Sequence, residues 1–161
     1  EPDPYRFARF AKPDSHVAID RVTLPLGHYS IIGYEYRVAI LRCNLRQLFN
    51  GVTGNRDRFM SDLARVATAS SAHVVFEFSM ADMDCWDAPR GCHGSVRAWE
   101  SRYAFAPWFC GDKQYGERYT YGILDRWYRD HVLGEERESI SRRSRRQAKA
   151  FLGGTGDMPQ V

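Results

Sequence analysis

The sequence has no long apolar run, few cysteines and little lysine, and each scarcity narrows the class of protein. A membrane-spanning helix needs ~20 consecutive apolar residues, whereas the longest apolar run here covers residues 38–41. We therefore expect a soluble chain. Four cysteines in 161 residues are too few for a disulfide-dense small scaffold, although an even number permits two bridges.

Motifs that bind cofactors are also scarce. The glycine-rich stretch GGTG at residues 153–156 has no strand before it and too little chain after it for a helix. A phosphate-binding loop needs both, because the glycines cradle the phosphate at the start of a helix. We therefore expect no cofactor, and the length of the chain indicates one domain.

Positive charge is concentrated near the C-terminus. Only three of the 23 basic residues are lysines, and the formal net charge is +3. Residues 137–149 hold six basic residues and one acid, which leaves −2 for the rest of the chain. We predict a basic helix over residues 135–152 and a flexible tail over 153–161. Such a helix contacts phosphates or an acidic protein surface, or is simply a solvated charged helix.

The N-terminal segment is rich in proline. Three prolines within EPDPYRFARFAKPD disfavour helix and bias the residues before them toward extended forms. We predict an extended arm over residues 1–14, whose aromatic side chains are anchors for its own core or for a partner. These anchors are Tyr5, Phe7 and Phe10.

Hydrophobic periodicity predicts the elements of the core, residues 15–134. Alternating patterns favour strands over residues 16–24, 29–43, 73–80 and 95–105, and helical patterns favour 55–70 and 117–134, with a short turn of helix over 45–51. The region 36–80 suits a β-α-β crossover or a helix packed across one sheet. We expect an α+β fold with a mostly antiparallel sheet of about four strands packed by two amphipathic helices.

The stretch CWDAPRGCH at residues 85–93 resembles chemistry more than any other. Zinc usually takes two closely spaced ligand pairs, a spacing that Cys85, Cys92, His93 and Cys110 do not have, so we expect no metal site. A Pro-Arg-Gly turn between the cysteines favours a Cys85–Cys92 disulfide. Reduced structural thiols, or a Cys92 nucleophile activated by a histidine, are the alternatives.

Two residues of the predicted strand 73–80 form a further candidate. His73 and Glu77 fall on the same face, where alternating polar side chains can make an acid–base pair. The simpler interpretation is that they line the solvated side of an amphipathic strand.

Taken together, these features favour a non-catalytic accessory or structural subunit of a larger multi-protein or ribonucleoprotein assembly. Its partners would be neighbouring protein subunits, with RNA or another polyanion at the basic helix. Two alternatives stay open: a small secreted enzyme, hydrolase or toxin-like, that uses Cys92 or His73/Glu77, and an autonomous RNA-binding domain. The first residue is not Met, which suits a processed mitochondrial or secreted protein. The predicted partner-binding residues are Tyr5, Phe7, Phe10, Arg142, Arg143, Arg145, Arg146 and Lys149.

Overall fold

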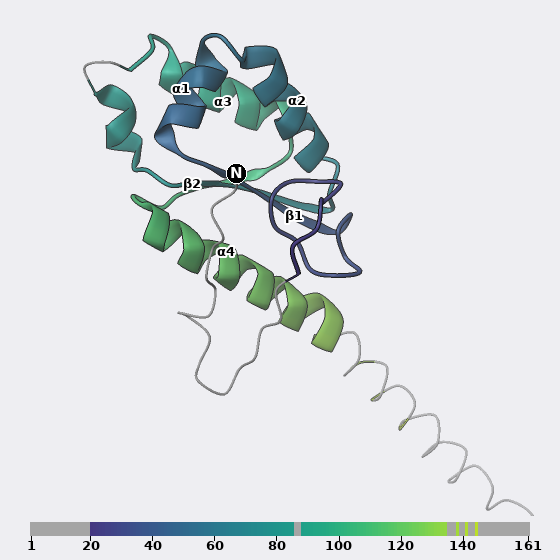
Figure 1. Cartoon of the computed structure of the whole chain (residues 1–161). Helices are drawn as coiled ribbons and strands as arrows, with labels where there is room; N and C mark the ends of the chain where they lie inside the picture. The colour runs from purple at the N-terminus through teal and green to yellow at the C-terminus, as the bar shows by residue number, and fades with distance from the viewer. Residues whose placement is uncertain (1–19, 86–87, 135–137, 139–140, 142–143, 145–161) are drawn as a thin grey trace, which may run out of the picture. The chain divides into compact units, whose positions relative to one another are not determined.

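A computed structural model describes residues 20–85, 88–134, 138, 141 and 144 (Figure 1). The chain divides into two compact units, one up to Leu124 and one from Asp125 onward, which are described separately. None of the described helices combines the length and apolar character that crossing a bilayer requires. In chain order the elements are β1 (Val38–Cys43), α1 (Leu45–Val52), α2 (Arg56–Val66), β2 (Ser71–Phe76), the 3-10 helix η2 (Met80–Asp84), α3 (Cys92–Arg102), β3 (Ala106–Phe109), α4 (Lys113–Tyr128) and the π-helical η3 (Arg129–Leu133).

The described sheet has three strands in the order β1-β2-β3, and all of them are parallel. The prediction of a mostly antiparallel sheet of about four strands is therefore wrong. The physical reason lies in the connections, because antiparallel neighbours are usually joined by short hairpins and parallel neighbours need a crossover. Here α1 and α2 separate β1 from β2, and α3 separates β2 from β3.

Three segments differ from their predicted form. Residues 95–105, predicted as a strand, mostly form α3, and the predicted loop over 106–116 contains β3 and the start of α4. The predicted strand over 29–43 is a strand only from Val38. Of the predicted strand 16–24, residues 16–19 lie outside the described residues and 20–24 form no strand. The predicted arm and basic helix lie almost entirely outside the described residues.

The segment before β1 is held against the sheet by a close backbone approach. Gly27 has a φ of +64°, and a Cβ atom there would lie 2.6 Å from the carbonyl oxygen of Ile40. Tyr29 then forms an antiparallel bridge with Ile40. Glycine is required at residue 27 because any side chain would meet both the strained φ and this carbonyl.

Both faces of the sheet are covered within the first unit. Every residue of β1 is buried, as expected for a strand that packs on two sides. Figure 1 shows α1, α2 and α3 on one face and α4 on the other. The first face packs Leu48, Leu63, Val66, Val96 and Trp99 onto alternate strand residues. On the second face Ile40, Val75 and Cys110 pack with Tyr29, Ile123 and Leu124.

Strand β3 lies at one edge of the described sheet. It contains Pro107, which has no amide hydrogen. The amide of Cys110 donates to the carbonyl of Phe76, toward β2. Backbone groups alternate in direction along a strand, so the nitrogen of Pro107 faces away from β2, at the outer edge where proline is tolerated.

Candidate interaction surface

Four rings follow one another across the second face of the sheet and onto α4. We call His73, Trp108, Tyr119 and Tyr115 the aromatic row. The ring centroids of His73 and Trp108 are 6.3 Å apart, and those of Trp108 and Tyr119 are 5.7 Å apart. The exposed fraction rises along the row, from 36% at Trp108 to 42% at Tyr119 and 50% at Tyr115. The guanidinium of Arg118 lies 5.4 Å from the centre of the Tyr115 ring.

The positions of these rings follow from the local structure. Trp108 is the register partner of Val75, two residues beyond His73 on β2, so both rings stand on the same face of the sheet. Tyr115 and Tyr119 are four residues apart on α4 and therefore lie on one side of the helix. Asp112 fixes the first turn of α4, because its side chain accepts from the backbone N–H of Tyr115 at 2.8 Å.

Hydrogen bonds determine which nitrogen of His73 carries the proton. The indole N–H of Trp108 donates to His73 Nδ1 at 3.2 Å, and Ser71 Oγ lies 2.9 Å from His73 Nε2. An indole nitrogen can only donate, so Nδ1 is the acceptor and Nε2 bears the proton that is shared with Ser71. Partial burial lowers the pKa of His73 below its usual value of 6.5. The ring is therefore neutral near pH 7.

This arrangement cannot activate Ser71 as a nucleophile. A serine nucleophile gives its proton to an unprotonated histidine nitrogen, whereas the nitrogen that faces Ser71 is already protonated. The lone pair at Nδ1 is occupied by Trp108. The Ser71–His73 contact is thus a structural hydrogen bond.

We expect the stability of the protein to fall as the pH drops below about 6.5. The folded state lowers the pKa of His73, so the unfolded chain binds a proton first and stability is lost as the pH falls from the unfolded pKa through the folded one. Urea unfolding between pH 8 and pH 5 measures this dependence. His73→Gln should flatten the part of the profile just below pH 6.5, and an unchanged profile in that variant would contradict the assignment.

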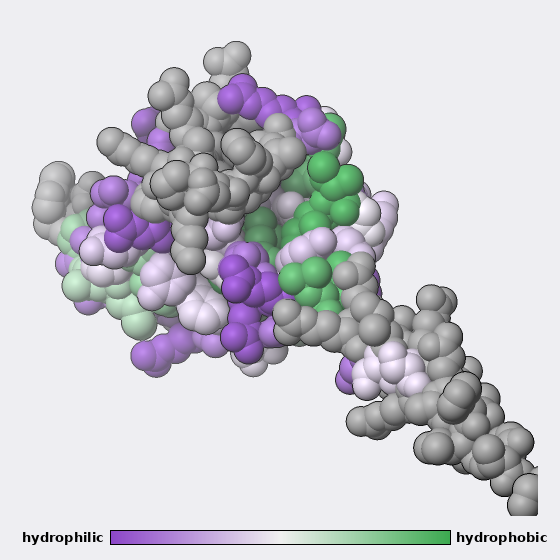
Figure 2. Space-filling view, turned by 90° about the horizontal axis from the view of Figure 1, so that it is seen from below, coloured by the Kyte–Doolittle hydropathy of each residue, from purple (hydrophilic) through white to green (hydrophobic). Residues whose placement is uncertain are grey.

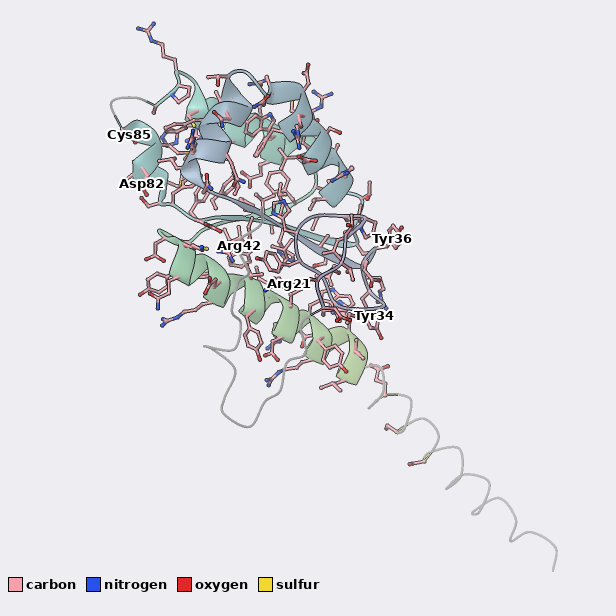
Figure 3. All side chains as sticks on the ribbon, viewed as in Figure 1. Arg21, Tyr34, Tyr36, Arg42, Asp82 and Cys85 are labelled. Carbon is pink, nitrogen blue, oxygen red and sulfur yellow. The ribbon has the colours of Figure 1, made fainter. Side chains whose placement is uncertain are left out.

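A buried ion pair lies at the carboxyl ends of β1 and β2. Arg42 Nη2 is 2.6 Å from Glu77 Oε1, and the two side chains are only 2% and 8% exposed. Arg42 also donates to the carbonyl of Lys113 at 3.1 Å, at the start of α4. Figure 3 shows Arg42 between the sheet and this helix. A Cβ at Gly116 would lie 3.1 Å from Arg42 Nη2, so glycine lets the helix approach the pair.

The ion pair separates the two residues predicted as an acid–base pair. Glu77 faces Arg42, whereas His73 faces Ser71 and Trp108. Residues four apart in an extended chain are roughly 13 Å apart. The structure therefore does not bring His73 and Glu77 together as one site.

The cysteine loop forms no disulfide, because none of the four cysteines is bridged. Cys92 begins α3 and is buried, and this burial raises the pKa of its thiol. A raised pKa opposes the thiolate that a nucleophile needs. The histidine next to it, His93, instead contacts Asp84 through Nε2 at 2.8 Å. Cys85 is half-buried.

The two remaining buried cysteines resemble Cys92. Burial raises the pKa of Cys43 and raises that of Cys110 to about 11. Both cysteines belong to the hydrophobic clusters on the two faces of the sheet. In the described ranges, no group of three or more His, Cys, Asp or Glu side chains is arranged to hold a metal ion.

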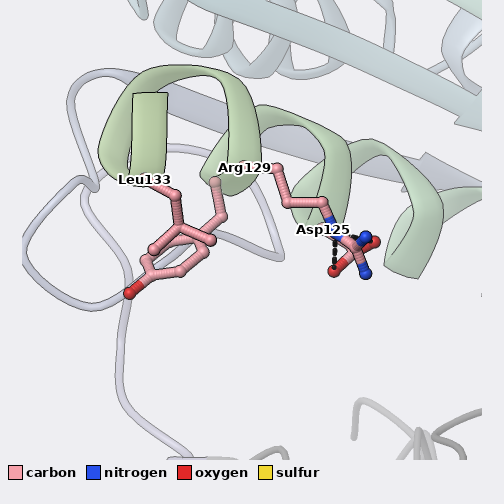
Figure 4. Close-up of a pocket in the computed structure, with 4 residues that line it drawn as sticks. Asp125, Arg129 and Leu133 are labelled. Carbon is pink, nitrogen blue, oxygen red and sulfur yellow. Dashed lines mark hydrogen bonds and ion pairs between the residues drawn. The ribbon is translucent and has the colours of Figure 1, made fainter. Parts of the chain in front are cut away.

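The second unit carries a pocket, shown in Figure 4, that is lined by Asp125, Tyr128, Arg129 and Leu133. Its charged groups are engaged with each other, since Arg129 Nε lies 3.0 Å from an Asp125 oxygen. An ion pair between residues four apart, such as Asp125 and Arg129, stabilises a helix.

The residues predicted to bind partners, Tyr5, Phe7, Phe10, Arg142, Arg143, Arg145, Arg146 and Lys149, lie outside the described residues. The aromatic row was not predicted. Its one signal in the sequence is the spacing of Tyr115 and Tyr119, which are four residues apart and share one side of the helix with Ile123. Figure 2 views the molecule from below and shows hydrophobic residues in separate patches between polar ones.

No catalytic constellation therefore emerges from the described residues, and the aromatic row is their strongest candidate for contact with another molecule. Comparison with family models, with curated proteins and with solved structures finds no match for this chain.

Proposed function

We propose that this chain is a non-catalytic subunit that binds a protein partner through the aromatic row. The observation that carries the proposal is the contact of Trp108 with Tyr119 on the surface, next to Tyr115 and Arg118. Tryptophan, tyrosine and arginine are the residues most enriched at the energetic centres of protein interfaces. Rings of this kind bury a large area while losing few rotamers.

The charge around the row favours a protein over a nucleic acid. Residues 112–119 hold two acids and two basic residues, so this part of the surface is neutral. Single-stranded nucleic acids also stack on aromatic rings, but they require a basic groove along the backbone. A neutral aromatic surface suits a partner that contributes apolar and polar side chains.

The candidate chemistry elsewhere supports a binding role. Ser71 meets a protonated nitrogen of His73, Glu77 is paired with Arg42, and Cys92 is a buried thiol with a raised pKa. The surroundings of each group therefore stabilise it in an unreactive state. An active site would instead shift such groups toward a reactive form.

The predicted arm and basic helix remain part of this proposal as additional contacts. Aromatic side chains of residues 1–14 would fill pockets on a neighbour, and residues 135–152 would lie against an acidic protein surface or RNA. Deletion of either segment should weaken the assembly while the core of residues 20–124 stays folded, as judged by circular dichroism.

The direct test replaces two rings of the row in the full chain. Tagged protein expressed in its native source should recover its partner, and the double variant Trp108→Ala/Tyr119→Ala should recover at least about tenfold less, since the two rings together should contribute about 1.4 kcal/mol or more. Tyr36→Ala is the matched control, because Tyr36 is a 68% exposed aromatic residue outside the row.

Two outcomes would contradict the proposal. Undiminished recovery by the double variant would show that the row is not the contact. Loss of the partner after ribonuclease treatment of a complex formed without residues 135–152 would show that RNA, rather than protein, is what the aromatic row holds. Circular dichroism of the variants separates lost binding from lost folding.

A further inference from the structure

We propose that His73 is a pH-sensitive lock that holds the Trp108 indole in the aromatic row and releases it when the imidazole is protonated. The effect of this lock on partner binding rests on the proposed function, whereas the movement of the indole ring does not.

The lock follows from the donors and acceptors at one contact. At neutral pH the Trp108 N–H donates to the lone pair of His73 Nδ1 over 3.2 Å. Protonation places a hydrogen on Nδ1, so two donors would face each other across the same distance. The hydrogen bond is lost, and the two N–H groups repel one another unless the rings separate.

Trp108 is the partner that moves. Protonated His73 still has a hydrogen on Nε2, so its contact with Ser71 Oγ, at 2.9 Å, is the same in both states. Trp108 belongs to neither buried cluster and is already 36% exposed. Its indole can therefore turn toward water, which also breaks its contact with Tyr119.

The groups that face His73 set the direction of the response. Its own strand contributes the Ser71 hydroxyl, β3 contributes the Trp108 indole, and β1 contributes the aliphatic Ile40 as register partner. From α4, the Tyr119 phenol reaches the cluster through Trp108. None of these groups is a carboxylate that would stabilise the imidazolium, and partial burial lowers the pKa of the ring. The release occurs below pH 6.5.

Nuclear magnetic resonance of the full chain tests the lock without any partner. With 15N-labelled tryptophan and 13C-labelled histidine, the Trp108 indole resonance should shift between pH 7.5 and pH 4.5, with the same midpoint as the His73 ring. That midpoint should lie below 6.5. Trp108→Phe assigns the indole signal, and Trp99, buried on the opposite face of the sheet, is the internal reference that should not follow.

His73→Gln is the decisive variant, because its amide oxygen accepts from the indole but does not titrate. In this variant the Trp108 resonance should stay constant with pH. Three results would overturn the lock: an indole signal that ignores the His73 midpoint, a shift that persists in His73→Gln, or unfolding before His73 titrates.

Recovery of the partner at pH 7.5 and below the His73 midpoint then tests the link to binding. Wild-type protein should recover at least about tenfold less partner at the lower pH, and His73→Gln should recover the same amount at both. If the indole titrates while recovery does not change, the lock stands and it is the role of the row in binding that fails.

Discussion

Replacing Glu77 by glutamine should lower the free energy of unfolding by about 3–5 kcal/mol, one of the two largest effects that we expect in this chain. The substitution conserves shape but removes the carboxylate that neutralises Arg42 at a site where both side chains are almost fully buried. Removing one partner of a buried ion pair leaves a charge that water no longer solvates, which costs more than the pair contributes while it is intact. Urea unfolding followed by circular dichroism measures the change.

Two further variants show whether the loss arises from removing the carboxylate charge of Glu77. Glu100→Gln removes an exposed carboxylate and should change stability by no more than about 0.5 kcal/mol. The double variant Arg42→Met/Glu77→Leu removes both charges and should recover much of the stability that Glu77→Gln loses. A double variant as unstable as the single one would mean that the shape of the site, rather than its charge balance, is what matters.

Replacing Trp99 by alanine should destabilise the protein by a similar amount, about 3–5 kcal/mol. Trp99 is 2% exposed and packs against Phe59 at a centroid distance of 5.0 Å, with the Arg56 guanidinium 5.4 Å from its ring. Alanine would leave a cavity between α2, α3 and the sheet, which the surrounding side chains fill only in part. Thermal and urea unfolding both report the loss.

The same substitution at Trp108 is the matched comparison. Trp108 belongs to neither buried cluster, so Trp108→Ala loses mainly the hydrogen bond to His73, about 1 kcal/mol. The two tryptophans should thus separate stability from binding, with Trp99→Ala affecting folding and Trp108→Ala affecting partner recovery. Equal destabilisation by the two substitutions would contradict the distinction between a core ring and a surface ring.

Local patterns predicted several elements of this fold. The stripe of Phe59, Leu63 and Val66 identified α2, and alternation from His73 to Phe76 identified most of β2. Asn55 is the N-cap residue of α2, although its side chain makes no capping hydrogen bond. These patterns arise from residues that are close together in the chain, so a single sequence is enough to detect them.

Other features depend on contacts between distant segments. Trp99, Tyr103 and Phe105 have the spacing of a strand, but Val96, Trp99 and Tyr103 also have the spacing of a helix. The segment forms a helix because this places Val96 and Trp99 in the core against the sheet. The direction of neighbouring strands depends on the crossovers between them. The partner of Glu77 is 35 residues away on β1, so no local pattern could reveal it. The aromatic row likewise joins β2, β3 and α4.

The outer edge of β3 limits how another molecule can attach beside the aromatic row. A strand from a second chain would seek amide hydrogens along that edge, and Pro107 withholds one of them in a strand of only four residues. Growth of the sheet from one copy to the next is therefore discouraged at this border. The proline therefore protects the protein against edge-to-edge aggregation, although exposed aromatic side chains lie close to the same edge.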